Sequence, residues 1–114
     1  MQYPHTTPLK SPRSNKPVKN QNVITGYNQY GNKDSSMATT QYTLFQSYDS
    51  KIALIETDPT GPDILYLDPD YYNYSVTTSK YLHIFLRQHY PAISKFGSVK
   101  DAIKADAVVF KKLN

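Results

Sequence analysis

The chain has 114 residues, with 13 basic and 9 acidic side chains and no cysteine. This length has room for one small domain, and the lack of cysteine excludes disulfides and thiolate metal sites. No apolar run approaches the roughly 20 residues that cross a bilayer, and the first ten residues contain no apolar run of the kind found in signal peptides. We therefore expect a cytoplasmic protein that does not contact a membrane.

The net charge of +4 is unevenly distributed along the chain. Residues 1–40 hold five basic side chains and one acidic side chain, so they account for all of it. Residues 41–70 hold six acidic and one basic side chain, whereas residues 71–114 hold seven basic and two acidic ones. If residues 41–70 and 71–114 occupy different faces, residues 41–114 form a dipolar domain. The alternative is two solvated faces whose charges balance each other.

Residues 1–40 are predicted to form a flexible basic arm. They contain four of the eight prolines and few aliphatic side chains, so they bury too little apolar surface to offset the entropy cost of ordering. Its basic residues are predicted to contact phosphates or an acidic protein surface; they are Lys10, Arg13, Lys16 and Lys19. The alternative is a leader that only adds solubility. Within the arm, residues 23–32 hold two tyrosines and two glycines and are expected to lie on the domain or on a partner. Met37 is an alternative start of translation.

Residues 41–114 are predicted to form a small α+β domain. Residues rich in aromatic and β-branched side chains predict three strands, over 41–48, 51–57 and 64–67. Asp49-Ser50 and the Pro/Gly-containing residues 58–63 predict the turns between them. Because these connections are short, neighbouring strands should pair as an antiparallel meander.

One main helix is predicted to follow the meander. It should begin at Thr77 or Thr78, where a hydroxyl can cap the first turn, and should end near His89 because Pro91 disfavours helical geometry in the preceding residue. Apolar residues at i, i+3 and i+4 spacing mark its buried face. A short helix over 98–105 capped by Ser98, with Asp101 in the capping-box position, and a strand over 107–110 are predicted to complete the domain.

The loop between the third strand and the helix is acidic and rich in tyrosine. Tyrosine provides rigid amphipathic contact area, so the loop is predicted to bind a partner protein through Asp68, Asp70, Tyr71, Tyr72 and Tyr74. The alternative is a loop whose tyrosines fold back over a small core. An Asp-x-Asp pair without further spaced ligands falls short of a calcium loop, so no metal site is predicted.

The entrance of the helix is a candidate anion site. Free backbone N–H groups of a first helical turn attract phosphate or carboxylate groups, and the residues predicted to take part are Thr77, Thr78, Ser79, Lys80 and, further along, Arg87. The alternative is an ordinary threonine cap with an exposed lysine. There is no glycine-rich phosphate loop, which argues against a nucleoside triphosphate site.

Little in the sequence indicates catalytic activity. His83 follows Ser79 by four residues and could neighbour it on the helix, but no orienting acid or oxyanion hole is apparent. His83 and His89 are six residues apart and do not share a helix face as metal ligands would. We therefore predict that the protein is not an enzyme and needs no cofactor.

Three stretches carry a resemblance to a known group of proteins. They are residues 47–53, residues 65–67 and the run Tyr-Ser-Val-Thr-Thr-Ser-Lys-Tyr over 74–81. Together they resemble a family of small domains of unknown function encoded by phages, plasmids and integrated elements, in which a Tyr-Ser-x-Thr-Thr-Ser-Lys-His signature opens a helix after short strands. The resemblance covers about residues 23–90, and Tyr81 stands where the signature has histidine. It implies a mobile-element setting and supplies no reaction.

Two functions are consistent with these features. The first is an anti-defence inhibitor, of the anti-CRISPR kind, that docks on a host protein or nucleoprotein effector in the cytoplasm of the host cell. The second is a DNA- or RNA-binding accessory protein of a phage or plasmid, which would bind nucleic acid through the arm and the later basic residues and lose affinity steeply with salt.

Overall fold

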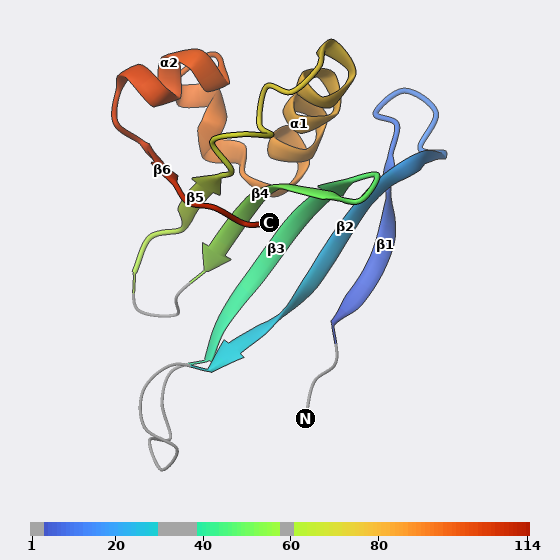
Figure 1. Cartoon of the computed structure of the whole chain (residues 1–114), viewed down its shortest axis with the longest axis horizontal. Coiled ribbons are helices and arrows are strands. Elements are labelled where there is room, and N and C mark those ends of the chain that lie inside the picture. Colours follow the sequence, from blue (N-terminus) through green and yellow to red (C-terminus); the bar gives the residue numbers. More distant parts are fainter. Residues whose placement is uncertain (1–3, 30–38, 58–60) are drawn as a thin grey trace.

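The computed structural model of the protein describes residues 4–29, 39–57 and 61–114. Within these residues six strands form one sheet, in the spatial order β1-β2-β3-β4-β5-β6. The strands are β1 (His5–Lys10), β2 (Pro17–Gln29), β3 (Thr39–Ser47), β4 (Ser50–Thr57), β5 (Ile64–Leu67) and β6 (Val108–Phe110). The helices are α1 (Val76–His89), the short 3-10 helix η1 (Pro91–Lys95) and α2 (Val99–Lys104). The predicted α+β class, with a meander, a main helix and a short C-terminal helix and strand, is confirmed (Figure 1).

The first five strands pair antiparallel with their neighbours in the chain, and β6 pairs parallel with β5. A parallel pair needs a crossover connection, and α1, η1 and α2 provide it. Of the predicted strands, 64–67 is observed with the same bounds, and 41–48 and 51–57 are observed as Thr39–Ser47 and Ser50–Thr57. The described part of the predicted turn over 58–63 is residues 61–63.

The N-terminus differs from the predicted flexible arm. Residues His5–Lys10 and Pro17–Gln29 are strands of the same sheet, and β2 pairs with β3 from Gln21↔Ser47 to Gln29↔Thr39. Leu9 and Val23 are buried in the core. The composition of the segment, considered alone, does not reveal a partner strand that satisfies its backbone hydrogen bonds. The predicted boundary between an arm and a domain at residue 40 is therefore corrected, because one sheet contains strands from both sides of it. Met1, Met37 and residues 30–32 lie outside the described residues.

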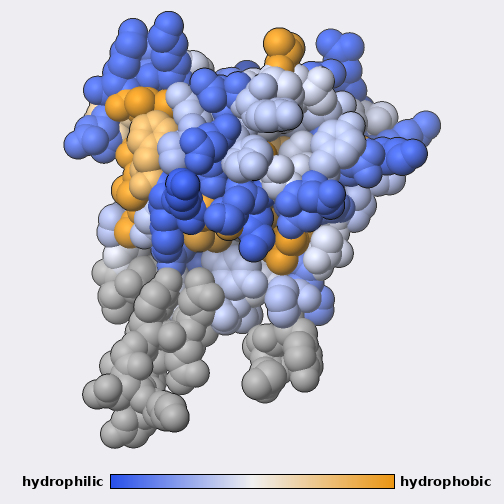
Figure 2. Space-filling view, in the orientation of Figure 1, coloured by the Kyte–Doolittle hydropathy of each residue, from blue (hydrophilic) through white to orange (hydrophobic). Residues whose placement is uncertain are grey.

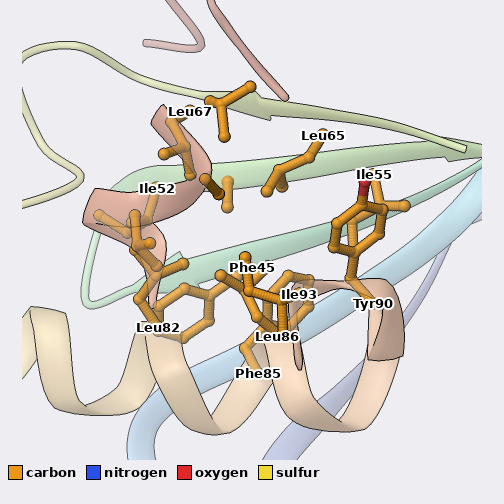
Figure 3. Packing of buried hydrophobic residues seen from close by; sticks show 14 of the residues in the cluster. Phe45, Ile52, Ile55, Leu65, Leu67, Leu82, Phe85, Leu86, Tyr90 and Ile93 are labelled. Atoms are coloured by element: carbon orange, nitrogen blue, oxygen red, sulfur yellow. The ribbon is translucent and has the colours of Figure 1, made fainter. Parts of the chain in front are cut away.

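Helix α1 packs against β3 and β4. Leu82, Phe85 and Leu86 point from the helix toward the sheet, as Figure 3 shows. Phe85 stacks on Phe45 of β3 with ring centroids 5.3 Å apart. Ile52, Ile55, Leu65 and Leu67 complete this layer from β4 and β5. Full burial of such a side chain contributes about 1.5–3 kcal/mol, so this contact fixes α1 on the sheet.

Helix α1 begins at Val76, before the predicted start at Thr77 or Thr78. Ser75, not a threonine, is the N-cap, and its Oγ accepts the Thr78 N–H at 3.0 Å. The predicted end is confirmed, with His89 as the last residue and Tyr90 as the C-cap before Pro91. The predicted cap of α2 is also confirmed, because Ser98 Oγ accepts the Asp101 N–H at 3.1 Å.

Candidate functional site

Asp68 is a structural residue rather than a surface recognition residue. Its side chain is 1% exposed, and it accepts hydrogen bonds from the backbone N–H groups of Asp70 (2.9 Å) and Leu113 (2.8 Å) and from Asn114 Nδ2 (3.0 Å). Burial alone would raise the pKa of this carboxyl, but these hydrogen bonds outweigh it and lower the pKa below its ordinary value of 3.8. The predicted protein-binding role of Asp68 is corrected: its carboxylate binds the C-terminal segment to the end of β5.

The remaining residues of the predicted loop point in different directions. Asp70 is exposed. The Tyr71 and Tyr74 rings lie together, with centroids 5.9 Å apart, whereas Tyr72 lies against Phe110 of β6 with centroids 5.5 Å apart. Tyr71 and Tyr72 are half-buried against the core, Tyr72 beside β6, whereas Tyr74 is exposed next to the Tyr71 ring.

Tyr71 and Tyr74 form one side of a hollow of about 620 Å³, which we name the tyrosine hollow. Tyr48, at the turn between β3 and β4, also lines it and is 60% exposed, and Tyr74 is 72% exposed. The Tyr48 N–H donates to Asn20 O at 2.7 Å, which ties this turn to β2. The remaining lining residues are Ser47, Asp49, Ser50, Ile52, Ser75, Thr77 and Thr78. The sequence interpretation missed Tyr48, whose signal was an aromatic side chain directly before the predicted Asp49-Ser50 turn.

Two buried polar atoms lie at or behind the tyrosine hollow. Ser47 is 4% exposed and Gln21, its cross-strand partner, is 1% exposed. Among the described residues, neither Ser47 Oγ nor Gln21 Oε1 has a hydrogen-bond partner. Such atoms are rare in folded proteins because leaving them unpaired costs free energy.

A second hollow, of about 430 Å³, lies between α1 and the connection from β1 to β2. We name it the basic hollow because Arg13 and Lys80 both line it; the other lining residues are Ser11, Pro12, Val18, Tyr81 and Ile84. Lys80 Nζ lies 5.3 Å from the centroid of the Tyr81 ring. Gln88 of α1 donates through Nε2 to Lys10 O at 3.0 Å, which holds the two walls together. Arg13 and Lys80 are far apart in the sequence and were both predicted to bind anions.

The other predicted anion-binding residues are not assembled around Lys80. Thr77 and Thr78 line the tyrosine hollow, and the Thr78 hydroxyl and N–H are both bonded to Ser75 Oγ at 3.0 Å. Ser79 lines a separate hollow of about 340 Å³ beside α2, and Arg87 lines one of about 180 Å³ near η1. Lys10 on β1, Lys16 between β1 and β2, and Lys19 on β2 are all exposed. The residues expected to form one anion site at the helix entrance therefore line different hollows, and Lys80 shares its hollow with Arg13.

The two histidines of α1 contact a backbone carbonyl and an aromatic ring. His83 Nδ1 lies 2.8 Å from the backbone carbonyl oxygen of Ser79, so this nitrogen carries the proton and donates it. The His89 ring lies against Phe85 with centroids 5.0 Å apart, and partial desolvation lowers its pKa below 6.5. The described residues contain no group of three or more His, Cys, Asp or Glu side chains placed to hold a metal ion.

The view in Figure 2 is mostly hydrophilic, with a larger hydrophobic area on the side of α2 and β6. Val109 and Phe110 of β6 are 47% and 44% exposed. In the parts of the chain that the structure describes, every helix falls short of the length and apolar character that crossing a membrane requires.

Comparisons with protein-family models, with curated proteins and with solved structures found no match to this chain.

Proposed function

We propose that this protein is a non-enzymatic binding protein of a phage-type mobile element, an anti-defence inhibitor of the anti-CRISPR kind that docks on a host nucleoprotein effector in the host cytoplasm. The observation that supports it is the pair of hollows built on the first turns of α1. The tyrosine hollow presents aromatic rings and the Asp49 carboxylate, and the basic hollow presents Arg13 and Lys80.

A nucleoprotein surface exposes protein side chains and phosphates side by side. Exposed tyrosines are the side chains that most often supply binding energy to protein partners, and a guanidinium with an ammonium group suits phosphate oxygens. A protein with both kinds of hollow therefore fits a nucleoprotein better than it fits bare nucleic acid. The resemblance of residues 74–81 to mobile-element domains supports the same setting.

The test measures complex formation with a panel of purified CRISPR effector complexes, by light scattering after size-exclusion chromatography, and interference with plasmid clearance in cells. We expect a stoichiometric complex with at least one effector. Tyr48→Ala combined with Tyr74→Ala should weaken it by about 30-fold or more, which corresponds to a hot-spot loss of about 2 kcal/mol. Tyr27→Ala is the matched control, because Tyr27 is a 50% exposed tyrosine outside both hollows. Absence of binding to every effector, or equal losses in both variants, would refute the proposal.

A DNA- or RNA-binding accessory role is the second candidate, because Arg13 and Lys80 share a hollow. It predicts binding of a labelled DNA duplex or RNA strand by the isolated protein, measured by fluorescence anisotropy at several salt concentrations. Lys80→Gln should reduce the slope of log affinity against log salt by about 1, whereas Lys51→Gln, an exposed lysine of β4 outside the basic hollow, should leave it unchanged. Weak binding with no change in slope would favour the inhibitor.

A further inference from the structure

We propose that the tyrosine hollow binds the cationic side chain of an arginine presented by the partner protein. This inference rests on the proposed function for the identity of the partner, but the ligand class follows from the hollow itself. Three properties of the lining residues carry it: their charge, their aromatic rings and the unpaired polar atoms beneath them.

The charge of the lining is negative. Asp49 is the charged member of the ten lining residues, all of which the structure describes, and the others are serine, threonine, tyrosine and isoleucine. The carboxylate is exposed at the β3–β4 turn, where it can pair with a guanidinium in the bidentate geometry that arginine favours. An anionic ligand would meet this carboxylate without a compensating cation.

The aromatic rings form the walls. Tyr71 and Tyr74 lie with an interplanar angle of 34°, and Tyr48 lines the same hollow from another part of the chain. Guanidinium groups are attracted to the faces of tyrosine rings and stack on them. Exposed tyrosines at the rim therefore serve a cation better than they serve a phosphate.

The unpaired polar atoms require a hydrogen-bond donor. Ser47 lines the hollow, and Gln21, directly opposite it on β2, points to the same side of the sheet because cross-strand partners share a face. Gln21 Oε1 can only accept hydrogen bonds, and a guanidinium offers five N–H donors with no acceptor. A phosphodiester oxygen carries no proton, so it could accept from the Ser47 hydroxyl but would leave Gln21 Oε1 unpaired.

The first turn of α1 borders the hollow, and a helix N-terminus by itself favours anions. Here one of its free donors is engaged, because Ser75 Oγ accepts the Thr78 N–H at 3.0 Å. The full negative charge of Asp49 exceeds the partial positive charge of a helix N-terminus, so Asp49 determines the sign of the ligand.

The experiment titrates the full-length ¹⁵N-labelled protein with Nα-acetyl-arginine amide and follows backbone amide resonances by NMR. The matched probe is Nα-acetyl-citrulline amide, which has nearly the same shape without the charge, and inorganic phosphate tests the anion alternative. We expect saturable shifts at Ser47, Tyr48 and Tyr71 with the arginine probe, and at least tenfold weaker binding of the citrulline probe. Equal binding of the two amides, or phosphate shifts at the same resonances, would overturn the proposal.

Three variants separate a binding role from a structural one. Asp49→Asn should weaken the arginine probe at least fivefold, whereas Asp106→Asn, an exposed aspartate outside the hollow with a backbone φ of 59°, should leave it unchanged. Ser47→Ala should weaken the probe severalfold while leaving the protein folded. If Ser47→Ala changes only the melting temperature, the hydroxyl is a packing residue and the proposal fails. Because the probe needs no partner protein, arginine binding in the absence of any effector complex would retain this site and reject the inhibitor function alone.

Discussion

The Asp68 carboxylate is predicted to be the most important single polar group for the stability of this fold. It joins the end of β5 to Leu113 and Asn114, which follow β6, and Asn114 in turn bonds the Lys51 backbone at both N and O, each at 2.8 Å. Asp68→Asn keeps the shape of the side chain and removes the charge. It also turns an NH₂ group toward donors, whichever way the amide is oriented.

The magnitude follows from the hydrogen bonds that are lost. The amide oxygen can still accept from one side, toward Asp70 N or toward the C-terminal segment, but the other donors lose their acceptor. A buried donor without a partner costs about 1–3 kcal/mol, and because these donors are neighbours the losses do not add fully. We expect Asp68→Asn to lower the free energy of unfolding by about 2–4 kcal/mol near neutral pH.

The loss should depend on pH with a definite sign. Hydrogen bonds lower the pKa of Asp68 below 3.8 in the folded protein, so its contribution is complete above the unfolded value and disappears as pH falls through the lower folded value. The difference between the wild-type protein and Asp68→Asn should therefore shrink on acidification below about pH 4.

The assay is urea unfolding followed by circular dichroism between pH 2.5 and 7. With a urea m-value of about 2 kcal/mol/M, the midpoint should fall by about 1–2 M at pH 7. Asp70→Asn is the matched control, since that side chain is exposed two residues away, and its effect should be within about 0.5 kcal/mol. An Asp68→Asn loss no larger than that of Asp70→Asn, or one that grows on acidification, would refute the reasoning.

Three further predictions concern packing and capping. Phe85→Ala should cost about 3–5 kcal/mol in urea unfolding, because Phe85 is fully buried against Phe45; a loss under 1 kcal/mol would contradict this packing. Gly26→Ala should destabilise by about 1–3 kcal/mol, because a Cβ there would lie 2.6 Å from the Tyr42 hydroxyl oxygen, and the loss should vanish in a Tyr42→Ala background if that contact is its cause. Ser98→Ala should lower thermal stability by about 1 kcal/mol through the lost α2 cap, and an unchanged melting temperature would show that the cap contributes nothing.

The local pattern of the sequence predicted the elements whose partners are close in the chain. The bounds of β5, the end of α1 before Pro91 and the Ser98 cap of α2 all follow from side chains within a few residues. The meander followed from short connections. These features depend on local propensity and turn chemistry, which a single sequence contains.

The candidate site depended on contacts between distant segments. Arg13 and Lys80 were both predicted to bind anions, but only packing of the β1–β2 connection against α1 places them in one hollow. Tyr48 joins Tyr71 and Tyr74 across more than twenty residues of sequence, and no periodicity indicates such a meeting.

By itself, the sequence determined the α+β class, the meander and the helix that follows it, because apolar spacing and caps act over one or two turns. That residues 5–29 join the sheet follows only from the folded chain, because β2 pairs with β3 and buries Val23 in a core that distant segments complete. Tertiary structure also decided that Asp68 is buried while Tyr48 and Tyr74 are exposed, because the burial of a loop side chain is set by the segments that fold over it.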